Sequence, residues 1–224
     1  MDILDVFYRR TYEFDINNKM LHYDYTFPTE EVTDYVQQIL CFPIDQLVQH
    51  DIESETADAI TPKDVFQFSS WENATDNICR ILNDIGNPGV TYLRAGKLLL
   101  NDGKSRNDIA YKKYGENHLK TAEALGLLYE LAHTYFVSCI GTIYLILNDE
   151  DRKRLNIRLL LRNKFIARLV KATSTATVNA RQFLYMLSDT TYARRKSNVK
   201  YILQYMQEST EYDFSQTTSK IHFS

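Results

Sequence analysis

The segment 113–128, "KYGENHLKTAEALGLL", decides the predicted fold, because it reads as the second helix of a helix-turn-helix. Before it, "RNDIAYKKY" (106–114) predicts a short helix, and Gly115 supplies the small residue that lets two helices cross steeply. After it, "TYFVSCIGTIYLIL" (134–147) predicts a β-strand that passes into a helix. Helix, tight turn, helix and strand is the order of a winged helix, in which a hairpin wing comes last.

A second candidate for a recognition helix is the segment 187–206, "LSDTTYARRKSNVKYILQYM". Thr190 or Thr191 can cap its N-terminus, and Ser188 and Asp189 are equally competent. Helical spacing predicts a core face made of Tyr192, Arg195, Val199, Ile202, Leu203 and Met206. Cations in the first turns of a helix oppose its dipole, so they indicate an anionic partner or a solvated surface.

Other segments predict further elements. A hairpin is expected around Asn17 and Asn18, and a polar, acidic loop or linker is expected from about residue 49 to 64. Helices are expected at 28–42, at 69–86 with Gly86 as the stop, at 91–100, at 157–173 and at 175–187. With only 7 Gly and 4 Pro, a turn-rich all-β fold is disfavoured.

The predicted fold class is therefore mainly α with small β-hairpins, built from tandem winged-helix or helix-turn-helix units. We expect five segments: an acidic N-terminal segment 1–65 (hairpin plus helix), a first winged-helix-like unit 66–100, a winged helix 101–156, a helix-turn-helix unit 157–207 and a polar tail 208–224. In the first 65 residues the sequence pattern predicts the elements least clearly.

Charge is divided unevenly along the chain. Residues 1–100 hold 7 Lys and Arg against 17 Asp and Glu, whereas residues 101–207 hold 18 against 9. This asymmetry favours an anionic partner for residues 101–207, which we expect to present one continuous positive surface. Three separated cysteines and the acidic N-terminus favour an intracellular, cytoplasmic protein with no signal peptide, no disulfide framework and no zinc site. No apolar run approaches the length of a membrane helix.

The two candidate helices supply the predicted DNA-binding residues. On the second helix, Arg194 and Asn198 are expected to read base edges, and Arg195, Lys196 and Lys200 to hold phosphates, with Ser197 and Tyr201 beside them. The first helix contributes Asn117 and Thr121 as outward side chains able to read bases. The cations around that helix are expected to meet phosphates, and they are Lys104, Arg106, Lys112, Lys113 and Lys120. His118 lies near this face, although a lone histidine is more often structural.

The stretches 113–128, 135–147 and 187–206 resemble winged-helix modules of bacterial restriction–modification and related defence proteins. The order of the elements from about residue 66 to 207 is also similar to the recognition half of type IIS restriction endonucleases. The resemblance implies that recognition helices make sequence-specific contacts to double-stranded DNA, and that a separate nuclease or methyltransferase subunit acts on it. It also implies that the chain is the recognition component of a restriction or defence system.

No catalytic signature accompanies this resemblance. A carboxylate followed by Asp/Glu-x-Lys on a strand, as the common restriction nucleases need, is not found, and neither a GxSxG elbow nor a phosphate-binding loop is present. We therefore expect no enzyme activity, no cofactor and no metal. The acids Asp45, Asp51, Glu53, Glu55 and Asp58 could hold a divalent metal, but a polar loop explains them better. The alternative function is a winged-helix protein-interaction or transcription-regulator module with no restriction role.

Overall fold

The chain is mainly helical and divides into two compact units. A computed structural model describes residues 30–49, 60–86 and 88–223. Unit 1 comprises Met1–Leu40 and Phe68–Arg152, and unit 2 comprises Cys41–Gln67 and Lys153–Ser224. Each unit is therefore built from two separate stretches of sequence. No helix among the described residues is both long enough and apolar enough to span a membrane.

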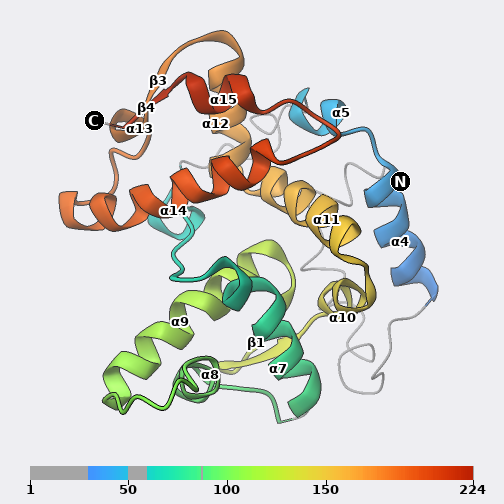
Figure 1. The fold of residues 1–224 in the computed structure, drawn as a ribbon, viewed down its shortest axis with the longest axis vertical. Coiled ribbons are helices and arrows are strands. Elements are labelled where there is room, and N and C mark those ends of the chain that lie inside the picture. Colours follow the sequence, from blue (N-terminus) through green and yellow to red (C-terminus); the bar gives the residue numbers. More distant parts are fainter. Residues whose placement is uncertain (1–29, 50–59, 87, 224) are drawn as a thin grey trace. The chain divides into compact units, whose positions relative to one another are not determined.

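The described residues of unit 1 form helices and an antiparallel hairpin (Figure 1). Its elements are α4 (Glu30–Cys41), a π-helix (Asn73–Asn77) that continues into α7 (Ile78–Ile85), α8 (Tyr92–Leu99), α9 (Asp108–Leu125), β1 (Leu128–Leu131), β2 (Thr134–Val137), α10 (Cys139–Ile146) and the start of α11 (Asp149–Arg162). The helices predicted at 28–42, 69–86 and 91–100 are confirmed, as is the strand that passes into a helix after residue 134.

The α9 helix is continuous, so the predicted break at Gly115 is wrong. The Asn107 side chain caps its first turn by accepting a hydrogen bond from the Ala110 N–H at 2.8 Å. A Cβ on Gly115 would lie 2.0 Å from the Tyr92 carbonyl oxygen, and one on Gly96 would lie 1.8 Å from that of Tyr111. Both glycines therefore serve the close crossing of α8 and α9, and the real turn between helices is the loop 100–107.

A short strand contact ties the beginning of α8 to the hairpin. β1 and β2 pair antiparallel, from Leu128 opposite Val137 to Leu131 opposite Thr134. Val90 lies between α7 and α8 and exchanges both backbone hydrogen bonds with Tyr135 of β2, at 3.0 and 2.8 Å. Unit 1 thus runs helix, bridge strand, helix, helix, hairpin. Most of the predicted segments 66–100 and 101–156 therefore lie in one unit, and Val90 joins them through the hairpin.

Unit 2 consists of helices joined by short turns, with one minimal parallel strand pair. Its elements are α5 (Ile44–Gln49), a 3₁₀ turn (Pro62–Asp64), most of α11, α12 (Lys164–Thr175), β3 (Val178–Asn179), α13 (Ala180–Phe183), α14 (Asp189–Gln207), α15 (Ser215–Ser219) and β4 (Ile221–His222). The helix predicted at 157–173 is two helices, because the Asn163 side chain caps α12 at the Ile166 N–H. The helix predicted at 175–187 shrinks to α13, because Val178 and Asn179 pair with β4.

The apolar part of the predicted core face of α14 is confirmed, whereas Arg195, which was predicted on the same face, is only half-buried. Ser188 is the cap, and its hydroxyl accepts a hydrogen bond from the Thr191 N–H. The apolar residues of that face are all buried: Tyr192, Val199, Ile202, Leu203 and Met206.

The segment 208–223 belongs to the core of unit 2, although the sequence predicts a polar tail there. Phe214 and Ile221 are buried, and Glu211 forms a bidentate ion pair with Arg158 at 2.6 and 3.0 Å. The predicted hairpin around Asn17 and the acids from Asp51 to Asp58 lie outside the described residues.

Candidate nucleic-acid interface

The side of α9 that faces away from the core carries a row of mostly charged residues. Ile109, Lys113, Glu116 and Lys120 follow one another at helical spacing, and we call them the outward stripe of α9. Ile109 is 80% exposed, and the two lysines are exposed as well. Leu119, Ala122 and Leu125 lie on the opposite, buried side of the helix.

Glu116 lies between the two lysines of the stripe. Its carboxylate accepts hydrogen bonds from Lys113 Nζ at 2.9 Å and from Lys120 Nζ at 3.1 Å. Partial burial acts to raise the pKa of Glu116, but the two lysines outweigh it and leave the pKa below its usual range. The stripe is therefore an ordered row of alternating charges.

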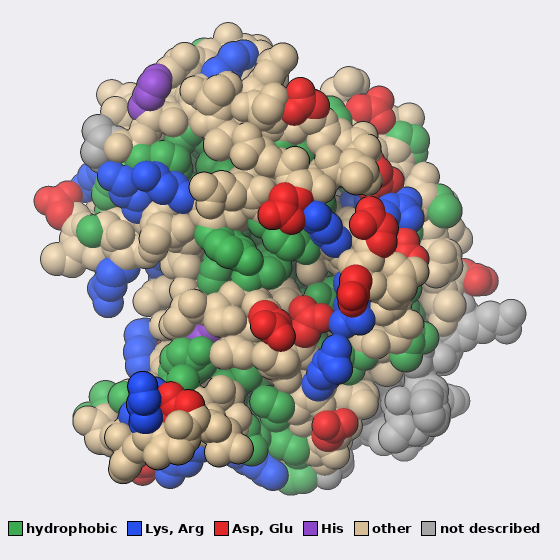
Figure 2. All heavy atoms as spheres, viewed as in Figure 1, with side chains coloured by type: hydrophobic (Ala, Val, Ile, Leu, Met, Phe, Trp, Pro, Cys, Tyr) green, Lys and Arg blue, Asp and Glu red, His purple; other side chains and the backbone are tan. Residues whose placement is uncertain are grey.

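Four further cations lie around α9, and two of them form ion pairs within unit 1. Arg106 forms a bidentate ion pair with Asp102 in the loop before α9, at 2.6 and 2.7 Å. Lys97 of α8 pairs with Asp108 at 2.9 Å. Figure 2 shows the same mixture of Lys or Arg beside Asp or Glu over the part of unit 1 that holds α8 and α9. Lys104 and Lys112 are exposed, and neither forms an ion pair with a described residue.

Two residues predicted near this face are buried. Thr121 is 2% exposed and His118 is fully buried, so Thr121 does not point outward as predicted. His118 Nε2 accepts hydrogen bonds from the backbone N–H groups of Ser69 and Ser70, at 3.3 and 3.4 Å. His118 Nδ1 then donates to the Tyr114 carbonyl oxygen at 2.8 Å. Burial lowers the pKa of His118, with the Tyr114 hydrogen bond opposing it, so the ring is a neutral structural bridge.

Ile109 and Glu116 are not among the site residues predicted from sequence, because that prediction assumes a helix break at Gly115. With one continuous helix, the buried positions Leu119, Ala122 and Leu125 put Ile109 and Glu116 outward. The same rotation turns Thr121 inward and leaves Asn117 half-exposed beside the stripe. A helical projection of the uninterrupted segment 108–125 would have found both residues.

The cations of α14 contact their own unit. Arg195 is half-buried and donates to the Pro62 carbonyl oxygen at 3.1 Å, and Lys196 donates to that of Phe223 at 3.2 Å. Lys200 Nζ lies 5.1 Å from the centre of the Phe223 ring. Burial lowers the pKa of Arg195, and the charge of Arg194 adds to this effect.

Asn198 is 7% exposed, so the prediction that it reads base edges from an outward position is wrong. It precedes the buried Val199 on α14. Arg194 is exposed, with its Nε donating to the Thr190 carbonyl oxygen at 3.2 Å. Ser197 and Tyr201 are exposed as well. The continuous positive surface expected for residues 101–207 stays a prediction, because those residues are divided between the two units.

A buried polar cluster underlies the hairpin. The hydroxyl of Tyr135 lies 3.0 Å from that of Tyr92 and donates to the Glu130 carboxylate at 3.0 Å. Burial is the first cause that raises the pKa of Tyr135, and the nearby tyrosine and carboxylates add to it. This cluster joins α8 to the hairpin, and the contact of Tyr92 with Tyr135 spans 43 positions, which no local sequence pattern indicates.

Among residues 30–49, 60–86 and 88–223, no group of three or more His, Cys, Asp or Glu side chains is arranged to hold a metal ion. Neither a protein-family model, nor a curated protein, nor a solved structure matches this chain.

Proposed function

We propose that the protein binds double-stranded DNA through unit 1, with α9 as the helix that enters the major groove. The observation that carries this proposal is the Val90–Tyr135 pairing. It completes the order helix, strand, helix, helix, hairpin, which is the order of a winged-helix domain. In such domains the third helix is the recognition helix, and it corresponds to α9 here.

The electrostatics of this region favour DNA over a neutral partner. From Tyr92 to Leu125 the chain holds seven Lys and Arg against four Asp and Glu. Lys104 and Lys112 are placed in the loop before α9 and on its second turn, where phosphates flank a recognition helix. Within the groove, Glu116 could accept from cytosine N4 and Ile109 could contact a thymine methyl group.

The hairpin departs from a typical DNA-binding wing. Its tip is formed by Ala132 and His133, which have positive φ angles of 49° and 63°, and it carries no Lys or Arg. Any contact of this wing with the backbone would depend on its N–H groups and on His133. We therefore assign the main phosphate contacts to the loop 100–107 and to α9.

Fluorescence anisotropy with a labelled random duplex at two salt concentrations tests this proposal. Because bound phosphates release counterions, the logarithm of the association constant should fall steeply with the logarithm of the salt concentration. Lys112→Gln should lower that slope by about one, whereas Lys63→Gln, an exposed lysine of unit 2, should leave it unchanged. No duplex binding at low salt, or a slope insensitive to Lys112, would reject the proposal.

The resemblance to restriction and defence proteins extends this proposal to a recognition component that works with a separate nuclease or methyltransferase subunit. The purified chain should then bind DNA without cutting or methylating it, since no such motif is present in the sequence. Incubation of plasmid with Mg²⁺ or with a methyl donor checks this. Magnesium-dependent cleavage that Glu53→Gln abolishes would show that the N-terminal acids form an active site.

A second candidate function is protein binding by the same face of unit 1. The observation that favours it is the apolar Ile109, 80% exposed, next to a row in which Glu116 offsets the lysines. Such a module would respond only weakly to salt. Ile109→Ser would then abolish partner binding and leave any weak DNA binding unchanged.

A further inference from the structure

Glu116 is the acid of the outward stripe of α9, and both oxygens of its carboxylate are engaged. Oε2 accepts a hydrogen bond from Lys113 Nζ at 2.9 Å, and Oε1 accepts one from Lys120 Nζ at 3.1 Å. The Glu116 side chain is 26% exposed, whereas those of Lys113 and Lys120 are 55% and 54% exposed. The acid is therefore more shielded from solvent than the two lysines that it binds.

The helix fixes this arrangement. Lys113 precedes Glu116 by three residues and Lys120 follows it by four, and both spacings place side chains on one face of a helix. A lysine side chain has a flexible stem of four carbons, so either ammonium group can leave the carboxylate for another anion. The shorter, partly buried glutamate stays beside α9. A phosphate that binds Lys113 or Lys120 must therefore compete with Glu116.

Such competition acts on every DNA sequence. Sequence-independent binding comes from contacts between cations and phosphates, and an acid beside those cations lowers it. A repulsive element of this kind raises specificity when the correct partner relieves it. In the major groove, the amino group at cytosine N4 is a donor that a carboxylate accepts, so it can take the place of the lysines.

We propose that Glu116 limits sequence-independent binding of duplex DNA by holding Lys113 and Lys120 in ion pairs. This inference rests on the DNA binding proposed for unit 1, and it concerns the regulation of the same face. Lys104 and Lys112 form no ion pair with a described residue, so they supply the basal attraction to phosphates. Glu116 then sets how much the two paired lysines add to it.

Neutralising the acid tests the proposal. Glu116→Gln keeps the shape of the side chain and removes its charge. Anisotropy titrations of the full chain with a labelled duplex of random sequence should then show about three- to fivefold tighter binding at 0.1 M salt, which is what two helical ion pairs contribute. The salt slope should also become steeper, by up to about one. Unchanged or weaker binding by Glu116→Gln would overturn the proposal.

Asp149→Asn is the matched control for net charge. Asp149 pairs with Arg152 on α11 and its side chain is 99% exposed, so this change also removes one negative charge from unit 1. It should leave the affinity within about twofold, because salt screens exposed charges that lie outside the binding face. An equal gain in Asp149→Asn would mean that net charge alone strengthens binding, and the proposal would fail.

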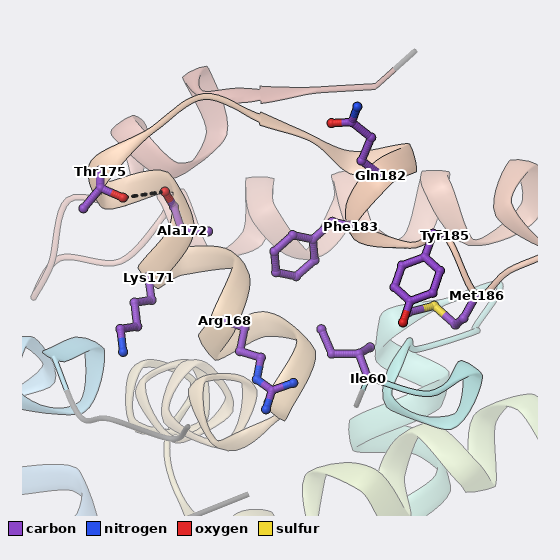
Figure 3. A pocket seen from close by; sticks show the side chains of 9 residues that line it. All are labelled: Ile60, Arg168, Lys171, Ala172, Thr175, Gln182, Phe183, Tyr185 and Met186. Atoms are coloured by element: carbon purple, nitrogen blue, oxygen red, sulfur yellow. Dashed lines mark hydrogen bonds between the residues drawn. The ribbon is translucent and has the colours of Figure 1, made fainter. Parts of the chain in front are cut away.

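Removing the two lysines separates ion pairing from direct repulsion of DNA. When Lys113→Gln and Lys120→Gln are both present, Glu116→Gln should produce no further gain, because no pair remains to be broken. In the background of Lys171→Gln, which changes a lysine that lines a cavity of unit 2 (Figure 3), the gain should persist. A gain that persists without Lys113 and Lys120 would show that the carboxylate repels DNA directly, and would overturn the proposal. So would a gain that is lost equally in the Lys171→Gln background.

The same titrations distinguish a failure of this inference from a failure of the proposed function. If neither wild type nor Glu116→Gln binds the duplex at low salt, DNA binding by unit 1 is wrong, and the inference fails with it. If wild type binds and Glu116→Gln binds no more tightly, only the inference is wrong.

Discussion

At the scale of single residues, His118 shows how a buried polar side chain can hold two distant segments together. Its ring joins α9 to the backbone at Ser69 and Ser70, and no other described side chain accepts hydrogen bonds from these two N–H groups. His118→Ala would leave these groups and the Tyr114 carbonyl oxygen without this partner and would create a cavity. We expect a loss of about 2–4 kcal/mol in the free energy of unfolding.

The same histidine predicts a pH dependence. Its pKa is lowered in the folded state, so the unfolded chain binds more protons as the pH falls below the ordinary value of 6.5. The stability that neutral His118 contributes is complete above about pH 6.5 and is lost below it. Urea unfolding at pH 7.5 and 5.5 measures this loss, which should be absent from His118→Ala. His133→Asn, at a side chain 99% exposed, should retain the wild-type pH dependence.

Glu211 and Arg158 also contribute stability that is lost at low pH, but through a charged pair instead of a neutral ring. The Arg158 guanidinium is 1% exposed and binds the Phe42 carbonyl oxygen as well as Glu211. Hydrogen bonds from Arg158 lower the pKa of Glu211 from 4.5 to about 2. Its stabilising effect is therefore present above about pH 4.5 and is lost as the pH falls toward 2.

Glu211→Gln should cost about 3 kcal/mol at pH 7, because it leaves a buried guanidinium without its counter-charge. The difference in unfolding free energy between wild type and variant should shrink as the pH falls from 5 to 3. Glu208→Gln is the matched control, since the Lys153–Glu208 pair is more exposed and should contribute under about 1 kcal/mol. Equal losses in both variants would contradict the structural role assigned to Arg158.

At the scale of elements, the crossing of α8 and α9 predicts that replacing a glycine by alanine lowers the stability of the protein, which is the opposite of its usual effect in a helix. Replacing glycine by alanine inside an ordinary helix stabilises it by about 1 kcal/mol. Here Gly96→Ala or Gly115→Ala should instead cost about 2–3 kcal/mol, because each new Cβ would collide with the backbone of the other helix. Thermal unfolding measures the change, and Ala110→Gly, at an exposed position of α9, gives the intrinsic glycine penalty.

The elements that could be predicted from sequence are those whose signals are local. The core face of α14 follows from its periodicity, and Gly86 ends α7 as expected. The break predicted at Gly115 is wrong because the sequence alone does not distinguish a glycine that permits close helix packing from one that ends a helix. The pairing of Val178 with Ile221 depends on residues 43 positions apart, which no local pattern indicates.

The features of the candidate site also separate into those that local patterns predict and those that depend on residues distant in sequence. Exposure of Lys112, Lys113 and Arg194 follows from helical spacing and agrees with the structure. The partners of Arg195 and Lys196 are the carbonyl oxygens of Pro62 and Phe223, far away along the chain. A run of cations therefore indicates a charged helix surface, but only the tertiary structure shows which of these cations already contact other groups of the protein.

At the scale of the whole molecule, the proposed DNA binding has to be assigned to one unit or to both. The tandem arrangement predicted from sequence would use both α9 and α14. The contacts within unit 2 argue against α14, because Arg195, Lys196 and Lys200 already bind groups of that unit. We therefore expect DNA affinity to depend mainly on unit 1.

Comparing the two helices in the intact protein tests this expectation. Replacing Lys112 and Lys113 together by alanine should weaken duplex binding roughly tenfold at 0.1 M salt and lower the salt slope by up to two. Arg194→Ala, which removes an exposed cation of α14, should leave affinity within about twofold. The reverse result would make α14 the recognition helix. Equal weakening by both changes would mean that each unit contacts DNA, because independent phosphate contacts add to the same slope.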